Sequence, residues 1–133
     1  MILGLDVSTS CTGWCVLENS GKLIDMGMIV LSKQKSLYTK SKTVRNALND
    51  ILIRHNINKV FIEENLQSFR AGFSSAKTLS TLARFNGIVS LIAYETFSIE
   101  PEHLNVNSAR RSLGIKLIRK QDGGKPTKEQ VLE

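Results

Sequence analysis

The first thirty residues alternate short apolar runs with clusters of turn-forming residues, a pattern typical of strands. The apolar runs are Ile2–Val7, Thr12–Leu17 and Lys22–Val30, and the clusters between them are Ser8–Ser10 and Asn19–Gly21. Connections this short join strands that run in opposite directions, because parallel strands need a long crossover. The pattern therefore predicts a three-stranded antiparallel meander.

Helical and strand-like segments alternate in the rest of the chain. Between Ser36 and His55, apolar side chains recur at the spacings of an amphipathic helix. The short apolar run Lys59–Glu63 is typical of a buried parallel strand. The later segments are a long apolar helix capped by Ser74 or Ser75 and reaching Phe97, a strand Leu104–Val106, a short helix from Asn107 or Ser108 to Gly114, and a capping box that opens a helix at Thr127.

This order of elements predicts an α/β fold. A meander followed by strands that are linked through helices gives a mixed five-stranded sheet, with helices on both faces. The length of 133 residues suits one domain, so we expect residues 1–133 to form a single unit. Since the helix beginning at Thr127 meets Glu133 after about one and a half turns, we expect it to be cut short.

Composition narrows the class of protein. The chain is 41% hydrophobic and 23% charged, which predicts a globular domain rather than a disordered one. Apolar runs stay short of the ~18 residues of a membrane span, and the first residues lack the basic start of a secretion signal. We therefore expect a cytoplasmic protein with no membrane role. Cys11 and Cys15 match no metal or redox spacing and are expected to be packing thiols.

The net charge of +6 is concentrated in two basic runs. The first run contains Arg110, Arg111, Lys116, Arg119, Lys120, Lys125 and Lys128, with Asp122 as its one acid. The second is free of acids and contains Lys33, Lys35, Lys40, Lys42 and Arg45. Such runs are typical of surfaces that bind a polyanion such as nucleic acid, although a solvated face that serves solubility would have the same composition.

Two acids lie in otherwise apolar strand segments. Asp6 is near the end of the first predicted strand and Glu63 ends the fourth, and each would be costly there without a cation. If these strands are parallel neighbours, their ends lie ~4.8 Å apart, and the two carboxylates could hold magnesium together. Alternatively, both side chains face solvent at strand ends. Glu64 must point to the side opposite Glu63, and periodicity does not decide which of the two joins Asp6.

The loop after the fourth strand contains Phe69, Arg70 and Phe73. Two aromatic rings beside a cation can stack on unpaired bases and contact phosphate. The alternative is that the rings fold back onto their own domain. Neither histidine indicates a functional site. His55 at a helix end is expected to be structural, and His103 has no obvious partner.

Several segments resemble one known family. ILGLDVSTSCTGWCVLE resembles the first hairpin of the RuvC-type Holliday-junction resolvases of the ribonuclease H-like superfamily, with Asp6 matching their first catalytic aspartate and Gly13 their TG turn. VFIEEN is similar to their fourth strand and places Glu63 on their catalytic glutamate. TLARFNGIVSLIA resembles their small-residue helix, and the residues from Asn107 to Lys116 fall where their basic helix and loop approach DNA. The resemblance covers essentially the whole chain. Val7-Ser8 replaces the usual Pro-Gly.

The resemblance implies an endonuclease that cuts four-way (Holliday) or branched DNA by two-metal hydrolysis with Mg²⁺ or Mn²⁺. Asp6 would bridge both ions and Glu63 would hold one. The family's remaining acids would follow Lys128 and are absent, so we expect these 133 residues to be metal-free and inactive unless Asp122 or Glu129 substitutes.

The resemblance also implies a homodimer, because four-way junctions are two-fold objects. The interface candidates are Leu91, Ile92, Tyr94 and Phe97, which could equally belong to the core of one chain.

Other functions compete with this one. A non-catalytic module that binds branched DNA would use the same basic surfaces. GLDVSTS also resembles the phosphate loop of sugar kinases, actin and heat-shock ATPases, but that architecture needs two such domains. A nuclease acting on RNA:DNA hybrids or precursor ribosomal RNA would share the fold and the metals.

Overall fold

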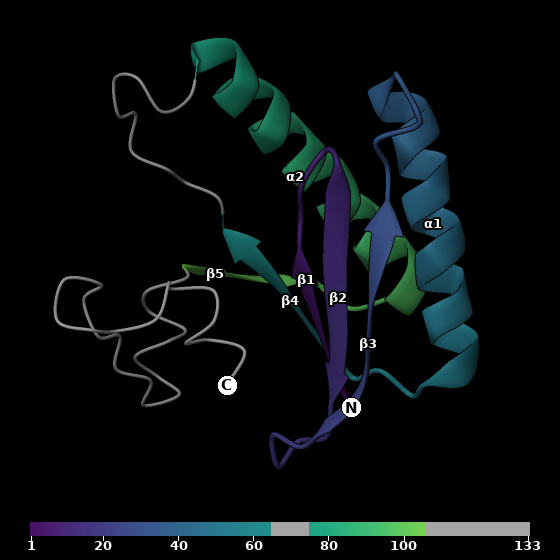
Figure 1. Ribbon diagram of the computed structural model, residues 1–133. Helices are drawn as coiled ribbons and strands as arrows, with labels where there is room; N and C mark the ends of the chain where they lie inside the picture. Colours follow the sequence, from purple (N-terminus) through teal and green to yellow (C-terminus); the bar gives the residue numbers. More distant parts are fainter. Residues whose placement is uncertain (65–74, 106–133) are drawn as a thin grey trace, which may run out of the picture.

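Five strands and two helices form residues 1–64 and 75–105, the part of the chain that the computed structural model describes (Figure 1). In chain order they are β1 Ile2–Asp6, β2 Cys11–Leu17, β3 Leu23–Val30, α1 Leu37–Arg54, β4 Lys59–Glu64, α2 Ala76–Phe97 and β5 Glu102–Asn105. Every element predicted within these residues is present, with small shifts at the ends. The predicted helices near Gly114 and Thr127 lie outside the described residues.

The sheet has the order β3-β2-β1-β4-β5. The meander β1, β2 and β3 is antiparallel, whereas β4 pairs parallel to both β1 and β5. The predicted mixed five-stranded sheet is therefore confirmed. Because β1 and β4 are parallel neighbours, both end at the same edge of the sheet, which we call the carboxyl edge. The turn between β1 and β2 also lies there.

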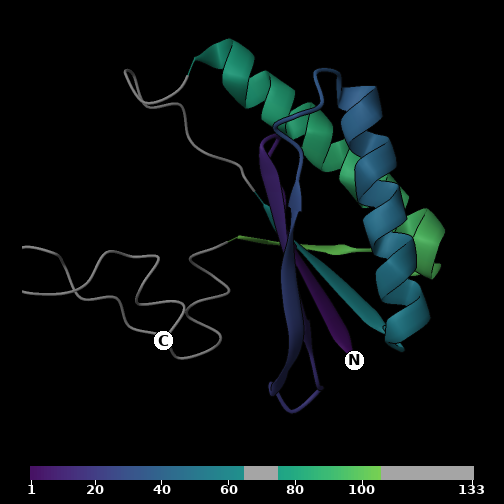
Figure 2. The ribbon, with the colours of Figure 1, turned by 45° about the vertical axis from the view of Figure 1, so that its right-hand side comes forward.

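The core lies between one face of the sheet and the two helices. Alternate residues of the strands, such as Leu3 and Leu5 of β1 and Ile62 of β4, are buried against Leu48 of α1 and Phe85 of α2. Figure 2 shows both helices on the same side of the sheet. Helices were predicted on both faces, and the described residues supply them on this face alone; the segments predicted to form further helices lie outside the described residues.

Serine caps fix where both helices begin. The Thr39 backbone N–H donates to the Ser36 hydroxyl at 3.1 Å, and the Thr78 N–H donates to the Ser75 hydroxyl at 3.0 Å. Each bond satisfies one of the N–H groups that a helix leaves unpaired at its start. Ser75 is therefore the cap of α2, rather than its neighbour Ser74.

Two apolar residues of the helices are exposed. Leu52 is 45% exposed, because it follows Ile51 and is turned ~100° away from the buried stripe of α1. Ala83 of α2 is also exposed, whereas Phe85, two residues later, is fully buried. The spacing of apolar residues therefore locates the buried face of a helix only approximately, because an apolar residue next to that face can still be exposed.

An aromatic ring and an ion cluster join α1 to the sheet. The Arg54 guanidinium lies 5.7 Å from the centre of the Trp14 ring and donates to Asp25 at 2.8 Å. His55 Nε2 lies 2.9 Å from the same Asp25 oxygen, and this hydrogen bond is the main reason that the pKa of the Asp25 carboxyl is lowered. His55 therefore has a structural role, as predicted, at the C-cap of α1.

The Trp14 ring lies over Gly27 of β3, where any side chain would collide with it. A Cβ at Gly27 would come within 2.6 Å of the ring, whereas a Cβ at the helical Gly87 would meet nothing within 4 Å. We expect Gly27→Ala to lower the free energy of unfolding by about 1–3 kcal/mol. Gly87→Ala should raise it by about 0.5–1 kcal/mol, since alanine favours a helix. Urea denaturation measures both, and equal midpoints for Gly27→Ala and the unaltered protein would contradict this packing.

The thiol and membrane predictions can be compared with the described residues. Cys11 and Cys15 are both free and half-buried, which is consistent with packing thiols. Burial raises the pKa of the Cys15 thiol, partly offset by a hydrogen bond with the Gly4 backbone, so the thiol stays protonated at neutral pH. Neither α1 nor α2 combines the length and the apolarity that crossing a membrane requires.

Candidate active site

Asp6 and Glu63 lie on the same face of neighbouring parallel strands. In the register of β1 and β4, Gly4 pairs with Phe61, and each acid lies two residues further along its own strand. Side chains two residues apart point to the same face, and neighbouring strands are ~4.8 Å apart. The structure therefore brings the two acids together at the carboxyl edge. The same register selects Glu63, rather than Glu64, as the acid that shares a face with Asp6.

The acids face away from the helices. Leu5 and Ile62, the residues that precede them, are 4% and 0% exposed beneath the helices, whereas Asp6 is exposed and Glu63 is half-buried. The side-chain alternation of a strand explains this division. One face of each strand thus builds the core, and the other presents a carboxylate to a ligand.

A shallow hollow of about 390 Å³ contains both acids. Its lining includes Asp6, Glu63, Cys15, Phe61 and Leu104, which come from four different strands. The lining is mainly apolar apart from the acids. A ligand in this hollow would meet two carboxylates at the carboxyl edge of an otherwise apolar surface.

Gly13 leaves space beside Asp6. It is the antiparallel partner of Asp6 in β2, and a Cβ at this position would lie 3.9 Å from the Asp6 Cβ. That is an ordinary contact distance, so alanine would fit, whereas a longer side chain would cover the carboxylate. Glycine here keeps one flank of Asp6 open to a ligand.

Helix α2 holds the end of β4 through a polar contact. The Asn86 side-chain amide donates to the Glu63 carbonyl at 3.2 Å. Asn86 thus positions the strand that carries Glu63, a role that the sequence analysis missed. An asparagine within a largely apolar helix was the available signal, because a half-buried amide needs a partner. His103, which was predicted to lack an obvious partner, lies 2.9 Å from the Ser90 hydroxyl of the same helix.

Asp6 and Glu63 have the chemistry of metal ligands. Carboxylate oxygens are the ligands that Mg²⁺ prefers, so Asp6 and Glu63 fit that ion. Within residues 1–64 and 75–105, no group of three histidine, cysteine, aspartate or glutamate side chains could hold a metal.

Most of the predicted DNA-binding residues lie outside the described residues. These are Phe69, Arg70, Phe73, Arg110, Arg111, Lys116, Arg119, Lys120, Lys125 and Lys128. The second basic run, from Lys33 to Arg45, lies within the described residues. Within it, Arg45 forms a surface ion pair with Glu95 at 3.1 Å, and Lys40 donates to the Thr9 carbonyl at the carboxyl edge.

The four interface candidates of α2 divide into two pairs. Ile92 and Phe97 are 2% and 8% exposed and belong to the core of the chain, so they are wrong as interface residues. Leu91 and Tyr94 are 58% and 48% exposed on the outer side of the helix. Only the second pair is available to a partner.

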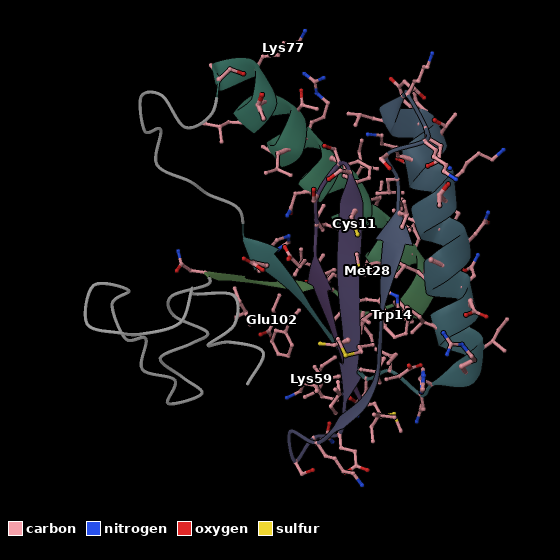
Figure 3. The ribbon with its side chains drawn as sticks, in the orientation of Figure 1. Cys11, Trp14, Met28, Lys59, Lys77 and Glu102 are labelled. Carbon is pink, nitrogen blue, oxygen red and sulfur yellow. The ribbon has the colours of Figure 1, made fainter. Side chains whose placement is uncertain are left out.

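Figure 3 shows where β4 and α2 begin relative to the two edges of the sheet. Lys59, at the start of β4, lies towards the edge opposite the carboxyl edge, and Lys77, at the start of α2, lies beyond the carboxyl edge. The start of α2 thus extends past the sheet on the side where β1 and β4 end. These features define the class of protein as a mixed α/β domain with two acids at the carboxyl edge of its sheet, which is the arrangement that the resemblance to ribonuclease H-like nucleases implies.

Comparison with known proteins gives the family. The model of the crossover junction endodeoxyribonuclease RuvC family matches residues 2–117. RuvC of Aliarcobacter butzleri is 31% identical over 133 residues, covering 98% of this chain and 77% of that protein. RuvC of Ehrlichia chaffeensis is 26% identical, covering 98% and 76%. The chain therefore belongs to the RuvC family of crossover junction endodeoxyribonucleases.

Solved structures agree on the fold. RuvC of Thermus thermophilus in complex with a Holliday junction substrate superposes with a TM-score of 0.68 at 16% identity, covering 84% of this chain and 68% of that chain. Another structure of the Thermus thermophilus protein gives a TM-score of 0.62 at 18% identity, with coverage of 85% and 68%. The resemblance drawn from the sequence motifs is confirmed.

Proposed function

We propose that this protein is a structure-selective endonuclease that hydrolyses phosphodiester bonds in four-way or branched DNA. The observation that carries the proposal is the placement of Asp6 and Glu63 on one face of two neighbouring parallel strands. Membership of the RuvC family supports the same activity. An ATP-binding function in the manner of actin or the sugar kinases receives less support, because the family match covers residues 2–117.

Asp6 and Glu63 would hold Mg²⁺ or Mn²⁺, two ions in the complete site. Such ions activate a water molecule and stabilise the leaving oxygen when they are bound. The chain contributes two carboxylates fixed on central strands, so little movement is needed to present them. Gly13 keeps the approach to Asp6 open. The expectation that these 133 residues alone are metal-free and inactive stays a prediction.

We further propose that the basic runs and the aromatic loop bind the arms of the DNA. The run from Arg110 to Lys128 would neutralise phosphates, and Phe69 and Phe73, with Arg70, would stack on bases at the branch point. Neither the phosphate contacts nor the stacking depends on base sequence. Together they would recognise the shape of the junction.

A homodimer would bring two such sites to one junction. Two-fold symmetry of the substrate calls for two-fold symmetry of the protein. Leu91 and Tyr94 are large, exposed and apolar or aromatic, and we propose them as part of the contact between the two copies.

Cleavage of matched substrates tests the function. The natural protein, with Mg²⁺, is expected to cut a synthetic four-way junction at two symmetric positions, at least about tenfold faster than a linear duplex of the same sequence. An RNA:DNA hybrid of that sequence serves as the second control. Faster cleavage of the hybrid would contradict the proposal, and cuts in only one strand of the junction would contradict the dimer.

A non-catalytic module that binds branched DNA is the second candidate. The observation that favours it is that the described residues offer two acids and no third ligand for a metal. Binding of the junction without cleavage under any divalent metal would support this candidate. Asp6→Asn separates the two functions. A nuclease should lose cleavage and keep junction binding, whereas a binding module has no cleavage to lose.

A further inference from the structure

The turn that follows Asp6 is held firmly in place. The Thr12 hydroxyl, which is fully buried, donates to the Ser8 carbonyl at 3.1 Å. On the other side, the Leu31 backbone N–H donates to the Ser10 carbonyl at 2.9 Å. Both ends of the turn Val7–Ser10 are therefore anchored to the meander.

A lysine from α1 holds the middle of this turn. The Lys40 ammonium donates to the Thr9 carbonyl at 2.6 Å. The side chain is half-buried, and in the part of the chain that the structure describes it forms no salt bridge with a carboxylate. An ammonium group has three donors, so two remain for water or an anion. Because the side chain is only half-buried, the ammonium is accessible to an anion from solvent.

The turn and its surroundings carry further groups that suit phosphate. The Ser8 and Ser10 hydroxyls lie 3.2 Å apart, and either can donate to an anion. Lys33 and Lys35 are exposed on the segment that follows Leu31, next to the turn. This part of the carboxyl edge is thus positive and rich in donors.

The turn lies at a suitable distance from the acids. Thr9 is three residues beyond Asp6, so at most ~11 Å separates their backbones. The phosphates of one DNA strand follow one another at ~3.4 Å along the helix axis. A DNA strand that lies across the carboxyl edge with its scissile phosphate at Asp6 would carry a flanking phosphate towards the Thr9 turn and Lys40.

We propose that Lys40 and the hydroxyls of Ser8 and Ser10 bind a phosphate that flanks the scissile one, so that the turn Val7–Ser10 seats the DNA strand against Asp6. This proposal rests on the proposed function and adds a substrate contact to it. Lys40 thereby has two tasks, since its bond to Thr9 fixes the turn and its charge holds the strand.

The salt dependence of binding tests the proposal. Affinity for a synthetic four-way junction is measured in EDTA, without cleavage, over a range of salt concentrations. Lys40→Met keeps the apolar stem and removes the charge, and should weaken binding about fivefold to tenfold at ~0.1 M salt, with a loss of ~0.9 in the slope of log affinity against log salt. Lys40→Arg should restore both. Ser8→Ala with Ser10→Ala should weaken binding twofold to fivefold and leave the slope unchanged, since no charge is lost.

Lys22→Met provides the matched control. Lys22 is an exposed lysine next to β3, at the edge of the sheet opposite the turn, so its loss should change neither affinity nor slope. A wild-type slope in Lys40→Met would overturn the proposal, even with a lowered melting temperature, because a purely structural lysine affects stability and not counterion release. Failure of the unaltered protein to prefer the junction over duplex would instead overturn the proposed function.

Discussion

In the full-length protein, Asp6→Asn should reduce junction cleavage on the order of 10³-fold while leaving junction binding intact. Asparagine has the shape of aspartate but lacks the charge that attracts a divalent ion. Asp6 is exposed, so the substitution should leave the melting temperature unchanged. Binding in EDTA should stay equal or become tighter, because one negative charge near the DNA phosphates is removed.

The control is Asp50→Asn on α1, which makes the same change of charge in a surface ion pair with Arg54. Exposed pairs of this kind contribute little, so both cleavage and binding should stay near those of the unaltered protein. Cleavage assays under single-turnover conditions measure the first effect, and fluorescence anisotropy measures the second. Retention of more than a tenth of the cleavage rate by Asp6→Asn would rule out its role.

Glu63→Gln is expected to have the second largest effect, a loss of about 10²-fold or more in cleavage. Glu63 shares a face with Asp6 in the parallel register, and the amide of glutamine is a poorer ligand for Mg²⁺ than a carboxylate. Asn86 still fixes the backbone of β4, so the strand should keep its place.

Glu64→Gln is the matched control for this substitution. Glu64 is the next residue of the same strand, and the change in charge and volume is identical. Comparable losses in both variants would mean that the register of β1 and β4 does not decide which acid acts. A loss confined to Glu64→Gln would exclude Glu63.

The sequence was sufficient to predict the elements and to single out Asp6 and Glu63, which the register of β1 and β4 places on one face. The spacing of Val44, Leu48 and Ile51 made α1 recognisable, and Ser36 marked its start. Asp6 and Glu63 stood out because charged residues are rare in short apolar strands. These signals are local, and each can be identified within one segment of the chain.

Contacts between distant segments could not be predicted in this way. The choice between Glu63 and Glu64 depends on the pairing of Gly4 with Phe61, which are separated by most of the domain. The bond from Lys40 to Thr9 depends on where α1 packs against the sheet. Register and helix placement follow from packing of the whole core, so periodicity within one segment carries no information on them.

Trp14 is the one tryptophan of the chain, and it lies between Gly27 and Arg54 at the junction of β2, β3 and α1. Its indole emission therefore reports on a single place in the molecule. Separation of α1 from the strands would remove the stacked guanidinium and admit water to the ring. Intrinsic fluorescence can thus follow the detachment of this helix without any attached label.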